Sequence, residues 1–325
     1  MALDEVGSAA AEGGVLDPHG PVARVAEDLW WLMFWLGLAV FVLFAVLLAL
    51  GLWRRRGDDV PRDDEEARLT RWWLVGGGVV LPIVGISVVF AATLAGMRDT
   101  PTEASAAADG ALEIELVGHQ FWYEVRYPEA GVVTANELHM PVGRPVVFRL
   151  TSRDVIHSFW VPALGGKMDL IPERENVLVL QADVPGRHVA RCGEFCGLSH
   201  AHMELVVVAE SDADFETWLS GIGETGAPTG DEAARGEEVF ASADCIRCHG
   251  PAYGVPDDGQ ELAGPDLTAM ARRASLGAGV LENTWDNAAA FIRDPAEFKP
   301  GVDMPANDLS DEDLAALLVY LGYDR

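Results

Sequence analysis

Two long uncharged segments dominate the hydrophobic pattern of the first hundred residues. Leu29–Trp53 and Trp72–Met97 contain no charged side chain, and the first would span roughly 37 Å as a helix, which is enough to cross a bilayer. Tryptophans gather near the segment ends, as interfacial anchors do: Trp30, Trp31, Trp35, Trp53, Trp72 and Trp73. A helix buried in a soluble core is the alternative, but two such segments in tandem favour a transmembrane hairpin over residues 29–97.

The basic residues predict the orientation of this hairpin. The loop between the two segments carries Arg54, Arg55, Arg56, Arg62, Arg68 and Arg71, whereas the flanks carry only Arg24 and Arg98. Positively charged loops stay in the cytoplasm, so both termini, including an N-terminal segment 1–28, are expected on the exterior or periplasmic side of the plasma membrane. The N-terminus lacks a basic region, so no cleaved signal peptide is expected.

Beyond a small-residue linker, Arg98–Gly110, the hydrophobic pattern changes twice. Residues 111–209 alternate with period two and are rich in β-branched and aromatic side chains, which predicts a β-sandwich or barrel. Residues 210–230 form a linker that begins with a short helix and ends in glycine, proline and threonine. Residues 231–325 follow a helical pattern, in which Ser310 and Asp313 predict the N-terminal cap of the last helix.

Charge narrows the possible partners. The formal net charge is −28, and so acidic a chain repels phosphate, which excludes nucleic acid as a partner. A basic protein partner is compatible with this charge, and so is an ordinary solvated surface. Asp154 and Asp169, near the motifs below, are either docking groups for a basic partner protein or ordinary surface acids. His119, His139 and His188 fall on strand-like segments and are expected to be structural or solvent-facing.

The motif CIRCH predicts a covalently bound haem. In C-x-x-C-H, two thiols add to the haem vinyl groups and the histidine is an axial iron ligand, which here gives Cys245, Cys248 and His249. The alternatives are a disulfide, a redox pair or half a zinc site, but the βαβ setting of a redox pair and a second Cys or His pair for zinc are both absent nearby. Met304, in a loop followed by proline before the last helix, is preferred as the distal ligand over Met270, which fits a helix core.

The stretch RCGEFCGLSHAHMELVVV predicts a copper site. Thiolate, thioether and imidazole ligands suit copper, and Cys192 and Cys196 are spaced to bridge two copper ions. Met203 follows on the same loop, while His157, in SRDVIHSFW, can supply a ligand from upstream; spacing does not separate His200 from His202. A disulfide, expected in an oxidising compartment, and mononuclear blue copper, which needs one cysteine, are the alternatives.

These residues resemble a known family: subunit II of haem–copper cytochrome c oxidases, in the caa-type form with a fused cytochrome c. The resemblance covers nearly the whole chain and is carried by GHQFWYEVRYP at Gly118, NELHMPVGRPV at Asn136, SRDVIHSFWVPALGGKMDLIPER at Ser152 and CGEFCGLSHAHM at Cys192. GPDLT at Gly264 is similar to the loop that packs along the haem of small cytochromes c. The implied fold is a two-helix transmembrane hairpin, a cupredoxin-like β-sandwich or barrel, and a class I cytochrome c helical domain.

The resemblance implies the metal ligands by position. The dinuclear CuA centre would be held by the side chains of His157, Cys192, Cys196, His200 and Met203 and by the backbone carbonyl of Glu194, which selects His200 over His202. The Glu194 carboxylate would reach a magnesium ion at the interface with subunit I.

Two features depart from the family pattern. GHQFWYE stands where GHQWYW is usual, so Phe121 occupies the position of the tryptophan through which electrons enter, with Trp122 beside it. Docking of an external cytochrome is therefore expected to differ. Glu65 and Glu66 do not match the spacing of the carboxylate that feeds a proton path in some members, so neither is assigned that role.

The implied function is electron transfer in a proton-translocating oxidase: from haem c to CuA and on to subunit I, where oxygen is reduced. Subunit I, subunit III, the lipid bilayer and a donor, either cytochrome c or an upstream respiratory complex, are the implied partners. The complete ligand set disfavours the quinol oxidase subunits that have lost this copper site. A CuA-bearing nitric oxide reductase subunit and a membrane-tethered copper-binding protein are the alternatives, although the second leaves CIRCH without a purpose.

Overall fold

The computed structural model describes residues 14–54, 63–98, 100–108, 110–253 and 262–324. It divides into two compact units, residues 24–100 and residues 1–23 together with 101–325. Arg55, Arg56 and Arg62, on which the predicted orientation partly depends, lie outside the described residues.

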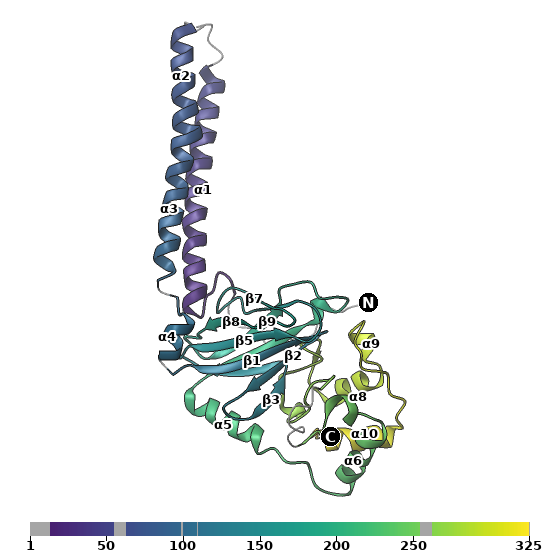
Figure 1. Ribbon diagram of the computed structural model, residues 1–325. Helices are drawn as coiled ribbons and strands as arrows, with labels where there is room; N and C mark the ends of the chain where they lie inside the picture. Colours follow the sequence, from purple (N-terminus) through teal and green to yellow (C-terminus); the bar gives the residue numbers. More distant parts are fainter. Residues whose placement is uncertain (1–13, 55–62, 99, 109, 254–261, 325) are drawn as a thin grey trace. The chain divides into compact units, whose positions relative to one another are not determined.

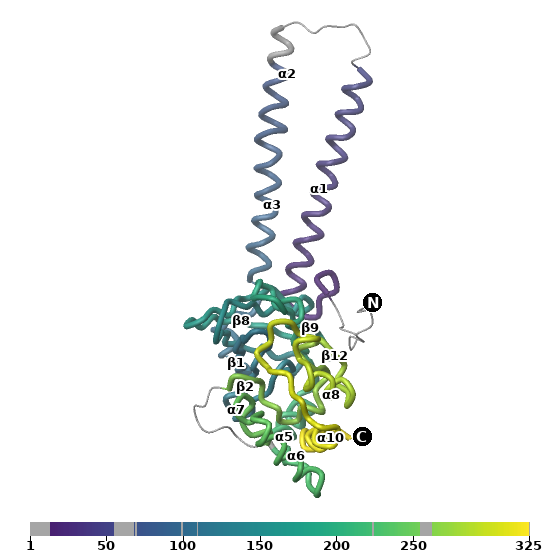
Figure 2. Tube along the Cα trace, turned by 90° about the vertical axis from the view of Figure 1, so that its right-hand side faces the viewer, coloured from purple at the N-terminus to yellow at the C-terminus, as the bar shows by residue number. Residues whose placement is uncertain are grey.

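The smaller unit is a helical hairpin. Its elements are α1 (Pro21–Arg54), α2 (Asp63–Val75), the π-helical turn η1 (Gly76–Val80) and α3 (Leu81–Gly96). Pro21–Arg54 and Thr70–Gly96 are both long and apolar enough to cross a membrane, with mean hydropathies of 2.8 and 2.4. Figure 2 shows α1 and α3 as neighbours, and Val25 lies against Gly96. Helix α1 begins at Pro21, before the apolar segment that starts at Leu29. Proline is favourable in the first turn of a helix, so the helix can start at this residue.

The larger unit contains two five-stranded sheets. The first has the order β3-β2-β1-β5-β8, with β1 at Leu112–His119, β2 at Trp122–Tyr127, β3 at Val132–Ala135, β5 at Val146–Ser152 and β8 at Asn176–Leu180. The second has the order β4-β10-β9-β6-β7, with β4 at Glu137–Pro141, β6 at His157–Trp160, β7 at Met168–Leu170, β9 at Gly186–Cys192 and β10 at Glu204–Glu210. Two strand pairs, β1–β5 and β4–β10, are parallel and the other pairs are antiparallel. This arrangement confirms the predicted β-sandwich (Figure 1).

The core of the sandwich comes from the alternation seen in the sequence. Ile114 and Phe148 from the first sheet and Leu138 and Leu205 from the second are buried in one hydrophobic cluster. Since successive side chains of a strand point to opposite faces, each strand gives one face to this cluster. The cluster also includes the two cysteines of the copper motif, so the predicted metal loop rests on the core.

One segment predicted as a linker is partly helical. Residues 103–108 form α4 (Glu103–Ala108), because its four alanines favour a helix and because Thr102 and Ser105 form reciprocal hydrogen bonds at its start. The short helix expected after the sandwich is α5 (Asp212–Gly223), and Ser211 caps it by accepting a hydrogen bond from the Asp214 amide.

The C-terminal part of the larger unit is helical around a second core. Its elements are α6 (Asp231–Ser242), α7 (Ile246–His249), η3 (Met270–Arg272), α8 (Trp285–Arg293), α9 (Pro295–Phe298) and α10 (Asp311–Tyr320). A small hairpin, β11 (Ser275–Leu276) and β12 (Leu281–Glu282), was not expected from the sequence. Ser310 accepts a hydrogen bond from the Asp313 amide at 3.1 Å, which confirms the predicted cap of α10. Helices α6 and α10 pack closely at Gly236 (Figure 1).

Candidate metal centres

The copper motif forms the loop between two paired strands. Strand β9 ends at Cys192 and β10 begins at Glu204, and the Cys192 amide donates to the Met203 carbonyl at 3.1 Å, which closes the loop. Strand β6 pairs with β9 at Phe159 and Cys192. This pairing brings His157 beside the loop, although it lies far upstream in the sequence.

The structure brings the five side chains of the predicted ligand set together. The Cys192 and Cys196 sulfurs are 3.8 Å apart, and the Cys196 sulfur is 3.6 Å from His200 Nδ1 and 3.9 Å from Met203 Sδ. His157 Nδ1 is 4.0 Å from the Cys192 sulfur. The ligand atoms of His157, Cys192 and Cys196 all lie within 4.8 Å of one another. His202 is exposed, whereas His200 is half-buried beside Cys196.

This donor set fits copper better than a disulfide. The two cysteines are free, and their separation is far beyond the roughly 2.05 Å of a sulfur–sulfur bond. The hydrogen bond between the two thiols lowers the pKa of Cys192 and raises that of Cys196. Soft sulfur donors with imidazole and a thioether, buried together, match the preference of copper.

Asp154 orients the upstream ligand. Its Oδ1 accepts a hydrogen bond from His157 Nε2 at 2.7 Å, which leaves Nδ1 facing the cysteines. A carboxylate on the far nitrogen fixes the tautomer of a ligating imidazole. Burial raises the pKa of Asp154, but the bonds from His157 and from the amides of Val155 and Gln120 outweigh it and hold this pKa below its usual range.

The expected magnesium contact finds no support. The Glu194 carbonyl lies 3.2 Å from the Cys192 sulfur, at the position expected of a backbone ligand. The Glu194 carboxylate is instead 3.5 Å from the ammonium group of Lys167. The same ammonium group donates to the Gly193 carbonyl at 2.9 Å. A lysine in this place competes with a cation for the same oxygens.

Phe121, just before β2, and Trp122, its first residue, are buried in different hydrophobic clusters. Phe121 is buried against Gly197 of the copper loop: a Cβ on Gly197, which has a φ of +135°, would lie 3.0 Å from the ring. Trp122 stacks on His119 with ring centroids 4.1 Å apart. The change of motif therefore keeps an aromatic ring against the copper loop at Phe121 and places a tryptophan, stacked on His119, at the next position.

The three histidines expected to be structural or solvent-facing are all buried. His119 lies 3.4 Å from Glu124, and His139 lies 2.6 Å from Glu210. His188 packs edge-on against His19, with ring centroids 5.2 Å apart. The structural interpretation fits these positions and the solvent-facing one does not.

The CIRCH motif forms the short helix α7 and the turn before it. Cys245 and Cys248 are free and half-exposed. His249 Nδ1 donates to the Pro265 carbonyl at 2.8 Å, which leaves Nε2 for a metal. Burial lowers the pKa of His249 and so favours the neutral, ligating imidazole. The GPDLT loop lies on this ring, since a Cβ at Gly264 would be 2.8 Å from His249 Cε1. These residues fit a c-type haem.

The two candidate distal ligands border the same core. Met270 is buried in it, at the start of η3, whereas Met304 is half-buried on the extended segment before α10. Their burial agrees with a core role for Met270, and the assignment of Met304 to iron stays a prediction.

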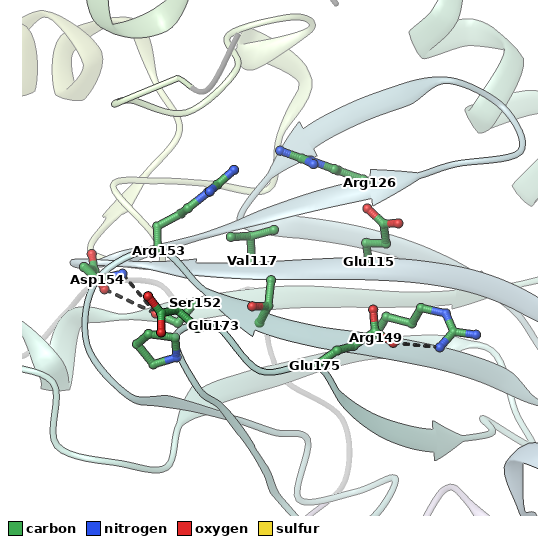
Figure 3. Close-up of a pocket in the computed structure, with 11 residues that line it drawn as sticks. Glu115, Val117, Arg126, Arg149, Ser152, Arg153, Asp154, Glu173 and Glu175 are labelled. Atoms are coloured by element: carbon green, nitrogen blue, oxygen red, sulfur yellow. Dashed lines mark hydrogen bonds and ion pairs between the residues drawn. The ribbon is translucent and has the colours of Figure 1, made fainter. Parts of the chain in front are cut away.

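A pocket of 630 Å³ lies on the outer face of the first sheet and ends at Asp154 (Figure 3). Two of its lining residues form an ion pair, in which Arg149 Nη1 lies 2.9 Å from Glu175 Oε1. The cysteines do not line this pocket, whose lining mixes carboxylates with guanidinium groups.

Two residues that support the copper loop were missed from the sequence. Gln120 donates through Nε2 to the Cys196 carbonyl, and no pattern signals a contact between segments so distant in the chain. From the sequence, Asp154 was expected to be either a docking group or an ordinary surface acid. Its spacing of three residues from a ligand histidine was the available signal.

Comparisons with known proteins agree with this geometry. The family described as "Cytochrome C oxidase subunit II, periplasmic domain" matches residues 131–210, and the family "Cytochrome c" matches residues 233–323. Cytochrome c oxidase subunit 2 of Alkalihalophilus pseudofirmus is 36% identical over 94% of this chain and 89% of its own length. The same subunit of Bacillus sp. (strain PS3) is 30% identical over 82% of this chain and 78% of its own length. Quinol oxidase subunit 2 of Bacillus cereus is 31% identical over 69% of this chain and 78% of its own.

A copper-type β domain and a cytochrome c domain on one chain with two candidate membrane spans define a class of respiratory electron-transfer subunits. The chain belongs to the cytochrome c oxidase subunit 2 family, in the form that carries a C-terminal cytochrome c domain. It is thus the electron-transfer subunit of a terminal oxidase.

Proposed function

We propose that this chain receives electrons in its haem domain, residues 231–325, and delivers them through its copper domain, residues 111–209, to an oxygen-reducing subunit I. The observation that carries the proposal is the joining of a His157–Cys192–Cys196 cluster to a cytochrome c domain. One-electron transfer between a c-type haem and a dinuclear copper centre is the chemistry that the two groups supply when bound.

The protein residues hold and isolate these groups. In the copper domain, the side chains of His157, Cys192, Cys196, His200 and Met203 and the carbonyl of Glu194 form the ligand set. When copper is bound, the two thiolates of Cys192 and Cys196 would share its charge, and the loop between β9 and β10 would hold the ligands in place. Asp154 holds the imidazole of His157 in its ligating tautomer.

In the haem domain, Cys245 and Cys248 would attach the haem, and His249 and Met304 would bind its iron. The hydrogen bond from His249 to Pro265 sets the ring orientation. We expect electrons to reach the copper through two aromatic residues. Phe121 packs against Gly197 of the copper loop, and Trp122 stacks on His119.

Partners and topology follow from the same reasoning. Phe195 and Leu198 on the copper loop are 77% and 80% exposed, an apolar surface suited to a protein partner such as subunit I. Subunit III and a cytochrome c or upstream complex as donor complete the expected assembly. The arginine distribution supports a cytoplasmic loop between the two membrane helices and both termini outside.

The test is spectroscopy and metal analysis of the complex purified through this chain. We expect a c-type haem band, two coppers per chain and a mixed-valence copper EPR signal, together with oxygen consumption. A single type 2 copper signal without haem would favour a copper carrier. Activity with nitric oxide and none with oxygen would favour a reductase.

A further inference from the structure

Segments of the haem domain lie on the copper domain, and both belong to one compact unit. The Ala274 amide donates to Glu137 Oε2 at 2.7 Å, the Glu204 amide donates to the Ala278 carbonyl at 3.0 Å, and Ser199 Oγ donates to the Pro300 carbonyl at 2.6 Å. These three bonds join two segments of the haem domain, residues 274–278 and Pro300, to three separate places on the copper domain.

The first contact uses a buried carboxylate. Glu137, at the start of β4, is 8% exposed, and its Oε1 lies 3.4 Å from His139 Nε2. Burial raises its pKa, but the hydrogen bonds from His139 and the Ala274 amide outweigh it, so the pKa lies below its usual range. A buried charge is costly unless hydrogen bonds satisfy it, and here one of those bonds comes from the haem domain.

The second contact covers an aromatic residue. Ala278, at the tip of the β11–β12 hairpin, forms a small buried cluster with Trp122 and Ala135. Trp122 is 7% exposed. Gly279 follows with a φ of +88°, and a Cβ there would lie 2.7 Å from Glu204. The fit of the hairpin tip on Trp122 and Glu204 is therefore close.

The third contact reaches the copper loop itself. Ser199, fully buried and next to the predicted ligand His200, holds Pro300. Lys299, 3% exposed, donates to the Gly277 carbonyl at 2.6 Å and so ties the segment at Pro300 to the β11–β12 hairpin. The two contact segments of the haem domain are thus braced against each other, which makes them one rigid surface.

We propose that Glu137, Trp122 and Ser199 form a resident docking surface for the haem domain of this same chain, held through turnover rather than reached by swinging on the linker. The docked hairpin covers Trp122, so a donor protein meets the haem domain and not the copper domain. The role in electron transfer rests on the proposed function, whereas the docking itself does not.

Hydrogen exchange of the intact, metal-loaded complex tests the docking. The Ala274 amide, bonded to Glu137, should be protected in the wild type. In Glu137→Gln the side chain still accepts but carries no charge, so the exchange of this amide should accelerate by roughly 3- to 30-fold, the difference between a charged and a neutral acceptor. Glu113→Gln is the matched control, because it removes an exposed carboxylate of the same domain that pairs with Arg149, and it should leave this exchange unchanged.

A second variant approaches the same surface from the copper loop. Ser199→Ala removes the bond to Pro300 and should accelerate exchange around Lys299–Gly301, so the test does not depend on one variant folding. Exchange of Ala274 at the rate of an open loop in the wild type, or rates indifferent to both substitutions, would overturn the docking. Such a result leaves the copper EPR signal and the haem band intact, whereas their loss from the wild type would count against the proposed function.

Discussion

A single carboxylate beside the copper loop links the ligand set to the rest of the sandwich. Asp154 bonds His157 Nε2 and accepts from the amides of Gln120 and Val155. It therefore fixes the direction in which the imidazole presents Nδ1. Its importance comes from orientation, since it does not itself touch the sulfurs.

Replacing this carboxylate should weaken copper binding. Asp154→Ala should lower copper affinity by about 10- to 100-fold, the usual cost of losing the partner of a ligating histidine, as measured by competition with a chelator. Asp169→Ala, on the neighbouring strand β7, should bind copper as the wild type does. Equal affinities for the two variants would show that His157 is oriented by packing alone.

A second carboxylate, that of Glu124, allows a prediction of how the free energy of unfolding depends on pH. Burial raises the pKa of Glu124, but its hydrogen bond to His119 and the charge of Arg126 outweigh burial and hold it below its usual range. A carboxyl whose pKa is depressed by folding contributes stability above its unfolded pKa of about 4.3 and loses it as the pH falls through the folded value.

Glu124→Gln should therefore be less stable than the wild type at neutral pH, with the gap closing as the pH falls below about 4. Urea unfolding of the complex at a series of pH values measures this, with the exposed Glu129→Gln as the control. A gap that stays constant down to acid pH would mean that the charge of Glu124 contributes nothing.

The ligand residues were predictable because their chemistry is unusual, but their support was not. Cysteine, histidine and methionine crowded on one loop indicate copper by type and spacing alone. The hydrogen bonds of Gln120 and Lys167 to that loop depend on strands that meet only in the folded chain. The magnesium expectation failed to find support for the same reason, since Lys167 approaches Glu194 from another segment.

At the scale of elements, the copper loop is positioned by strand pairing and the haem domain by helix packing. Helices α6 and α10 approach so closely that a Cβ at Gly236 would lie 2.1 Å from the Ala316 carbonyl oxygen and 2.6 Å from Tyr320 Cβ. Backbone atoms cannot move aside as a flexible side chain can. Only glycine fits this crossing.

Gly236→Ala should destabilise the haem domain by about 1 to 3 kcal/mol, the usual cost of overpacking, as measured by denaturant unfolding monitored at the haem band. Gly221→Ala is the matched control, because Gly221 lies within α5 and has no atom within 4 Å of an added Cβ. It should be neutral or stabilising by up to about 1 kcal/mol. A neutral Gly236→Ala would mean that the two helices separate without cost.

Elements with a strong hydrophobic period were predictable from the sequence. Elements that depend on contacts with distant parts of the chain were not. The two apolar helices, the alternating strands and the cap at Ser310 follow from local sequence. Helix α4 was mistaken for a linker, because its small residues read equally well as a flexible segment. The β11–β12 hairpin is too short to carry a period, although it makes the contact with Trp122.

At the scale of the whole molecule, the two metal domains have separate hydrophobic cores. The cluster behind the copper loop contains Cys192 and Cys196, whereas the second cluster contains the residues around the haem motif. A group that binds only the folded state stabilises the domain to which it binds.

Removing copper with a reductant and chelator should lower the unfolding temperature of the copper domain by several degrees, because the free energy of binding is lost. The haem domain should keep its band and its unfolding temperature. Differential scanning calorimetry of the complex, compared with an untreated sample and one reloaded with copper, measures both. An equal shift of both domains would show that they unfold as a single cooperative unit.

The pairing of β6 with β9 also dictates an order of maturation. His157 lies beside Cys192 only after these two strands have paired. A nascent chain therefore lacks the complete set of copper ligands. We therefore expect metallation to be a late step of biogenesis, performed on an already folded domain. Lesions that delay strand assembly far from the metal would show themselves in the cell as copper deficiency of the oxidase.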